Sequence, residues 1–133
     1  MKRGFTNIEL IFVIGVSLLV IAAMLGGFVN FLVINEHNRN MTLAANIARD
    51  LMEAVNAARS RGEFDSITSM SYTSGQLQSL YGVPANWGTC ARTVTDVSGT
   101  NGNLKFITIS VSWNERGRQI NNGVVLNSAV ARR

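Results

Sequence analysis

Glu9 is the residue whose type and position most suggest chemistry, because it is a carboxylate at the edge of a long apolar block. The residues from Leu10 to Ile34 carry no charge, and Ser17 and Asn30 are the strongly polar ones among them. A carboxylate at the centre of a bilayer costs about 2.5–3.5 kcal/mol, and less near the headgroups. Glu9 therefore either reaches back to the headgroups or pairs with a cation that the block itself does not supply.

Elsewhere the sequence offers little that could catalyse a reaction or bind a metal. Cys90 is the only cysteine and His37 the only histidine, so they form neither an intrachain disulfide nor a zinc site by themselves. An oxygen-rich turn at 96–102 contains one carboxylate, Asp96, whereas calcium loops usually gather several. We expect Cys90 to be a half-buried strand residue, and we expect no cofactor, no metal and no enzymatic activity.

The charge distribution disfavours a nucleic-acid partner. The net charge is +4, and half of it comes from Lys2 and Arg3, which precede the apolar block. DNA-binding surfaces usually carry a dense cluster of Lys and Arg. The rest of the chain has no cluster denser than Arg59 with Arg61, or Arg132 with its neighbour at the C-terminus.

The apolar block is long enough to cross a membrane as a helix. A helix over residues 10–34 would rise about 37 Å, more than the roughly 30 Å of a hydrocarbon core. A cleaved secretory signal fits poorly, because its apolar region is usually about 7–15 residues. A signal anchor fits better, since Lys2 and Arg3 would hold the N-terminus in the cytoplasm. That alternative leaves Glu9 without an explanation.

Residues 1–9, Met-Lys-Arg-Gly-Phe-Thr-Asn-Ile-Glu, resemble the prepilin leader motif of the type IV pilin-like proteins, the prepilin-type N-terminal methylation family. The shared features are a short basic leader, a glycine, a phenylalanine, a threonine, and a glutamate four residues after the phenylalanine. A long apolar helix follows, as in that family. Asn7 stands where leucine is more usual, and it leaves Gly4, Phe5 and Glu9 of the motif intact.

The resemblance implies a processing site and a set of partners. It implies that a prepilin peptidase cuts between Gly4 and Phe5 on the cytoplasmic side and methylates the new amine of Phe5. It also implies that Glu9 pairs with the Phe5 amine of a neighbouring subunit. The implied partners are other pilin or pseudopilin subunits, the peptidase, the inner-membrane assembly platform, and membrane lipid before assembly. Such a pair would fix the axial register, because a shifted subunit leaves both charges unpaired.

Gly26 and Gly27 mark a candidate break in the apolar helix. Many pilins carry a proline about this far along the span, and this chain has two glycines instead. Each glycine costs roughly 0.8–1 kcal/mol relative to alanine in a helix interior. We expect a continuous helix in lipid, where unsatisfied backbone groups are expensive, and an opened helix near 24–29 in a filament. The alternative is that the two glycines permit close helix packing.

Helical patterning continues beyond the membrane. From Asn35 to Arg61 the chain has no proline or glycine, and apolar residues recur at spacings of three and four. The recurring positions are Ile47, Leu51, Val55 and Ala58, with Ala44, Ala48 and Met52 beside them. The pattern predicts one helix from about Phe5 to Arg61 that ends at Gly62 and lays its outer half against a sheet.

The C-terminal half predicts a short helix and about three strands. The helix is expected over 73–81, and strands near 89–97, 107–113 and 118–130. Turns at 98–102 and 114–117 would join the strands as an antiparallel meander. Apolar residues occupy alternate positions of the second strand, which places Trp113 in the core. The predicted fold class is α+β, with a long N-terminal helix packed on a small antiparallel sheet, as in the pilin fold.

These elements divide the chain into three parts. Residues 1–4 are the cytoplasmic leader, 5–34 the transmembrane and filament-core half of the helix, and 35–133 a periplasmic or extracellular head. Before assembly the protein is expected in the bacterial inner membrane as a single-pass protein with a cytoplasmic N-terminus. After assembly it is expected in a periplasmic or cell-surface filament.

Two further segments resemble a subgroup of the family. Residues 43–55 and 111–117 are similar to minor pilins and to the I-type minor pseudopilins of type II secretion. Many major pilins close a C-terminal disulfide loop, which one cysteine cannot form. We expect the protein to be a structural subunit, of the minor or low-abundance kind, of a type IV pilus or a type II secretion pseudopilus. The alternatives are a filament-building major subunit, a competence pilin for DNA uptake, and a membrane-anchored periplasmic binding module.

Overall fold

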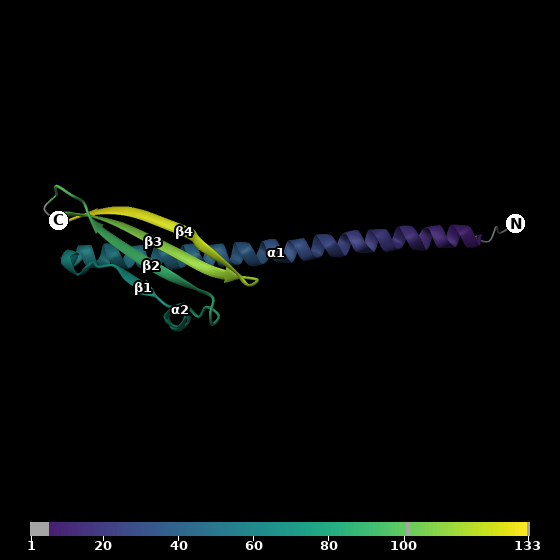
Figure 1. The fold of residues 1–133 in the computed structure, drawn as a ribbon, viewed down its shortest axis with the longest axis horizontal. Coiled ribbons are helices and arrows are strands. Elements are labelled where there is room, and N and C mark those ends of the chain that lie inside the picture. Colours follow the sequence, from purple (N-terminus) through teal and green to yellow (C-terminus); the bar gives the residue numbers. More distant parts are fainter. Residues whose placement is uncertain (1–5, 101, 133) are drawn as a thin grey trace. The chain divides into compact units, whose positions relative to one another are not determined.

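The computed structural model describes residues 6–100 and 102–132, and its fold is α+β (Figure 1). Two compact units meet at a boundary between Asn38 and Arg39. In chain order the elements are α1 (Asn7–Ser60), the 3-10 turn η1 (Phe64–Ser66), β1 (Met70–Tyr72), α2 (Ser74–Tyr81), β2 (Gly88–Asp96), β3 (Leu104–Glu115) and β4 (Arg118–Ala131).

Helix α1 has 54 residues and begins and ends close to the predicted positions. Its end is a Schellman motif, in which the Gly62 N–H donates to the Arg59 carbonyl at 3.1 Å and the Glu63 N–H donates to the Ala58 carbonyl at 2.9 Å. Gly62 has a φ of +80°, which glycine adopts without steric cost. The helix therefore stops where the chain must turn toward the sheet.

The sheet has four strands in the order β1-β2-β3-β4, all antiparallel. The sequence predicts about three strands after a short helix over 73–81, and the structure has one strand more. The additional strand is β1, which pairs Met70 with Arg92 and Tyr72 with Cys90. Three residues are too few to show an alternating pattern, which is why the sequence does not predict β1. The strand forms because the edge of β2 is available to pair with it.

The β3–β4 hairpin closes with a two-residue turn. Arg116 and Gly117 have φ angles of 50° and 77°, the left-handed pair that matches the twist of the flanking strands. Between Val111 and Trp113 the β3–β4 register shifts at a bulge. The predicted hairpin turn at 114–117 is confirmed, and the bulge bends the pairing beside Trp113.

The core of the second unit lies between the outer half of α1 and one face of the sheet. All five buried residues of α1 were predicted: Ala44, Ile47, Ala48, Leu51 and Val55. The sheet contributes the alternate positions of β3, and Trp113 is only 1% exposed, as predicted. Trp113 stacks on Trp87 with ring centroids 6.3 Å apart, and the Trp87 indole N–H donates to Asn40 Oδ1 at 3.1 Å.

A buried lysine joins the sheet to the segment after α1. Lys105 is 8% exposed, and its Nζ donates to the carbonyl oxygens of Phe64 and Ile67, both at 3.0 Å. The same ammonium lies 4.9 Å from the centre of the Phe64 ring. These contacts compensate the cost of removing the charge from water.

Gly123 provides a test of the packing around Trp113. A Cβ at Gly123 would overlap the Trp113 ring, whereas a Cβ at Gly75 in α2 would meet open space. We expect Gly123→Ala to lower the free energy of unfolding by about 1–3 kcal/mol, as overpacking usually does. Urea unfolding of the full chain in detergent, followed by tryptophan fluorescence, measures it. The control Gly75→Ala should leave the unfolding free energy unchanged or raise it slightly, because alanine favours a helix, and equal stability of both variants would contradict this packing.

Cys90 provides a second test, because burial raises the pKa of its thiol to about 11. The pKa in the unfolded chain is about 8.5. Since the folded pKa is the higher one, the contribution of this group to stability is fully present below about pH 8.5 and is lost as pH rises toward 11. At pH 8 we expect a thiol reagent to modify folded Cys90 at least about a hundredfold more slowly than the urea-unfolded chain. An exposed thiol from Ser79→Cys, in a Cys90→Ala background, should react quickly in both states.

Candidate functional site

The first turn of α1 contains the residue that the sequence singled out. Glu9 Oε2 accepts hydrogen bonds from the Thr6 N–H at 3.0 Å and from the Thr6 hydroxyl at 2.9 Å. The Glu9 N–H points back to Thr6 Oγ1 at 3.4 Å. This is a capping box, in which Thr6 and Glu9 each satisfy a backbone donor at the start of the helix. Gly4 and Phe5, the predicted processing site, lie outside the described residues.

The capping box is a role of Glu9 that our reading of the sequence missed. The signal was present, because a threonine three residues before a glutamate and ahead of an apolar run is a typical helix start. Both capping bonds end on Oε2, and Oε1 makes no hydrogen bond to the residues at 6–100 or 102–132. Glu9 can therefore cap its own helix and still present one carboxylate oxygen to a cation from another chain.

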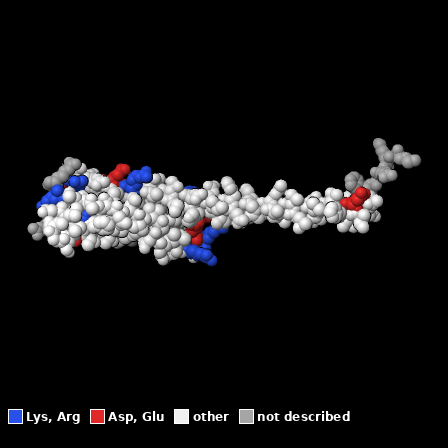
Figure 2. Space-filling view, turned by 90° about the horizontal axis from the view of Figure 1, so that it is seen from above, with Lys and Arg blue, Asp and Glu red and all other residues white. Residues whose placement is uncertain are grey.

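The helix that follows is apolar on every side. Its large side chains are exposed all the way around, from Ile8 at 77% and Phe12 at 72% to Ile34 at 59%. A helix that is apolar all round is normally buried in protein or in lipid. Among the described residues this is the one helix long and apolar enough to cross a membrane. Figure 2 shows no charged side chain along this part of α1 beyond its first turn, on the face drawn.

Ser17 is one of the two strongly polar residues inside the apolar block. The Ser17 hydroxyl donates to the Val13 carbonyl at 2.7 Å, so it adds no unsatisfied donor. Helix α1 runs unbroken through Gly26 and Gly27 in this single chain. The expected opening at these glycines concerns a filament, and it stays a prediction.

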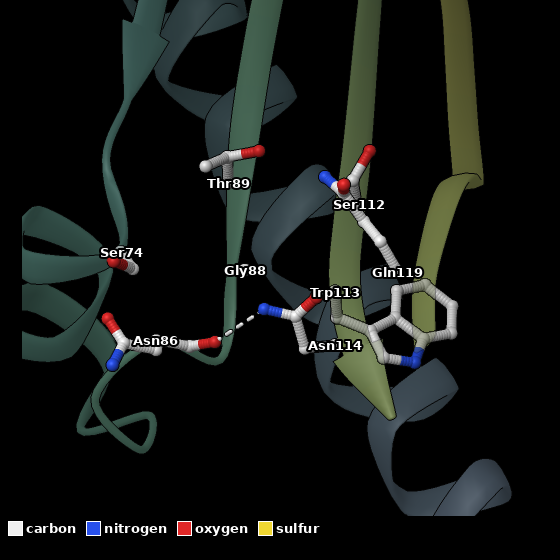
Figure 3. Close-up of a pocket in the computed structure, with 8 residues that line it drawn as sticks. All are labelled: Ser74, Asn86, Gly88, Thr89, Ser112, Trp113, Asn114 and Gln119. Carbon is white, nitrogen blue, oxygen red and sulfur yellow. Dashed lines mark hydrogen bonds between the residues drawn. The ribbon is translucent and has the colours of Figure 1, made fainter. Parts of the chain in front are cut away.

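A second candidate site is a polar pocket in the unit that begins at Arg39. Its volume is about 120 Å³, and its walls come from the start of α2, the start of β2, the end of β3 and the start of β4 (Figure 3). The lining residues are Ser74, Asn86, Gly88, Thr89, Ser112, Trp113, Asn114 and Gln119. Nothing in the sequence pointed to this pocket, because each residue is ordinary by itself and the fold brings the four segments together.

No candidate metal centre is present in the part of the chain that the structure describes. Residues 6–100 and 102–132 contain no group of three or more His, Cys, Asp or Glu side chains placed to hold an ion. Asp96, the one carboxylate of the oxygen-rich turn, is exposed at the end of β2.

Comparison with known proteins adds no relative. No protein-family model, no curated protein and no solved structure matches this chain. What the chain itself shows is a pilin-like architecture: a long helix with an apolar N-terminal half, whose outer half packs on an antiparallel sheet.

Proposed function

We propose that this protein is a structural subunit of a type IV pilus or of a type II secretion pseudopilus. The observation that carries the proposal is the N-terminal half of α1, which is apolar on all sides and starts at a carboxylate. Lipid can cover such a surface before assembly, and the same helices of neighbouring subunits can cover it afterwards. The unit from Arg39 onward has its own buried core, which supports its role as a head carried by this helix.

The proposed assembly step is a charge pairing at the start of the helix. Cleavage after Gly4 creates an amine on Phe5 that is cationic near neutral pH, and methylation leaves it a base. In an apolar filament core, an unpaired amine and an unpaired carboxylate are both costly, whereas a matched pair offsets much of that cost. Glu9 of one subunit then binds the Phe5 amine of the next, and subunits at other axial positions are penalised.

The proposed location follows from the same segment. Lys2 and Arg3 keep the N-terminus in the cytoplasm, so the head lies on the far side of the bacterial inner membrane before assembly. The prepilin peptidase and the assembly platform act on the N-terminal segment in that membrane. The resemblance of residues 43–55 and 111–117 to minor pilins and pseudopilins, together with the single cysteine, supports a minor subunit.

Processing is the first test of this proposal. We expect the mature protein to begin at Phe5 with a methylated amine when it is isolated from cells with an active prepilin peptidase. Intact-mass measurement distinguishes this form from the full chain. A Gly4→Leu substitution should leave precursor in the membrane, because the peptidase needs a residue without bulk at this position. Full-length chain beginning at Met1 in assembled filaments would rule out the proposal.

A matched pair of variants separates the charge of Glu9 from its capping role. Glu9→Gln removes the charge but keeps a side chain that can complete a capping box, so cleavage and helix content should stay normal. Its level in sheared filaments should fall to below about a tenth of wild type, because breaking a buried pair costs about 3–5 kcal/mol.

Thr6→Ala is the complementary variant, since it removes the threonine cap and keeps the carboxylate. It should cost about 1 kcal/mol of helix stability and still enter filaments at close to the wild-type level. Immunoblots of sheared filaments and of membranes measure both variants. The reverse pattern, with Glu9→Gln incorporated and Thr6→Ala excluded, would show that Glu9 acts by capping the helix.

A further inference from the structure

We propose that the polar pocket at the end of the sheet binds an uncharged, hydroxyl-rich ligand, namely a single hexose unit of a glycan. The pocket lies wholly within the unit that begins at Arg39, so the proposal does not depend on filament assembly. It rests on the uncommitted polar side chains of the lining, on the rigidity of the walls and on the absence of charge there.

Four lining side chains are open to solvent and, within the part of the chain that the structure describes, are not used in internal hydrogen bonds. Ser74, Thr89, Asn86 and Gln119 make no side-chain hydrogen bond to another residue in the described ranges 6–100 and 102–132. Two of them carry hydroxyls and two carry carboxamides, and each of these groups can both donate and accept. A sugar hydroxyl likewise donates and accepts, so it can satisfy either kind of group. Figure 3 shows Ser74 and Asn86 on one side, Gln119 on the other, and Thr89 on β2 between them.

The walls that carry these groups are fixed by other hydrogen bonds. Asn114 Nδ2 donates to the Asn86 carbonyl at 2.9 Å, and Ser112 Oγ accepts the Asn122 N–H at 3.0 Å (Figure 3 shows the first). Gly88 lets β2 approach β3 closely, because a Cβ there would lie 2.7 Å from the Trp113 Cα. A preformed wall reduces the ordering cost that a ligand must overcome.

The chemistry of the lining selects against ions. None of the eight lining residues is charged, so an anion would find no cation in the walls and a cation no carboxylate. The outward face of the sheet continues this character away from the pocket. By the strand register this face carries polar residues such as Thr93, Thr108 and Asn127 and exposed apolar ones such as Phe106 and Val125, and none of them is charged.

The pocket is smaller than a whole hexose, so one edge of the ring would enter it and the rest would face solvent. A volume of about 120 Å³ corresponds to roughly four water molecules, far below the 300–1,000 Å³ typical of sites for drug-sized ligands. Hexose hydroxyls would take the places of these waters on the uncommitted side chains. Trp113 is 1% exposed and offers no open face for stacking, so we expect a dissociation constant on the order of millimolar.

The direct test is a titration of the isotope-labelled full chain, followed by NMR. The detergent should be a phosphocholine, because glucoside and maltoside detergents would occupy a sugar site. Methyl glucoside, methyl galactoside and methyl mannoside are the probes, and sodium phosphate and sodium acetate are the charged controls. We expect at least one hexoside to shift the amide resonances of Ser74, Thr89 and Gln119 saturably, with no saturable shift from either salt.

A pair of isosteric variants locates the binding. Thr89→Val removes a lining hydroxyl from β2, and we expect the dissociation constant to rise about three- to tenfold, the effect of one lost hydrogen bond. Thr93→Val makes the same change on the same face of the same strand outside the lining, and it should bind like wild type.

Three results would overturn the proposal. The first is no saturable shift with any of the hexosides, and the second is an equal response of Thr89→Val and Thr93→Val. The third is saturable binding of phosphate or acetate at the pocket, which would assign it to an ion. Neither outcome of the Glu9→Gln experiment changes these titrations, so the two proposals are tested separately.

Discussion

The N-terminal half of this protein depends on one constraint: apolar side chains are unfavourable in water, and an unpaired charge is unfavourable among apolar side chains. The segment from Leu10 to Ile34 exposes apolar side chains on every side, so water is a poor solvent for it. Lipid and the apolar helices of other subunits are both suitable surroundings, and they differ in what they offer Glu9. In lipid the carboxylate can stay near the headgroups, whereas between helices it needs a cation.

The capping box gives Glu9 a local role that is compatible with this second requirement. One carboxylate oxygen is held by Thr6, which orients the side chain at the start of α1. The other oxygen is available to a donor from outside the chain.

The unit from Arg39 onward, the proposed head, is stabilised by its own hydrophobic core. The outer half of α1 supplies one wall, and Trp113, packed against Gly123 and Trp87, fills the end of the sheet. Lys105 ties β3 to the segment after α1 through two carbonyl oxygens. Since one face of the sheet carries this whole core, the opposite face, which is uncharged, does not contribute to it.

The sequence by itself determined the features that depend on a local pattern of residues. The apolar block, the spacing of Ile47, Leu51 and Val55, and the alternation that buries Trp113 depend on neighbours within a few residues, and all three are present in the structure. Strand β1, the burial of Lys105 and the polar pocket depend on residues far apart in the chain. Only the tertiary structure could decide them, because a three-residue strand needs the edge of β2, a lysine becomes buried only where carbonyl oxygens receive it, and a pocket exists only where separate segments meet.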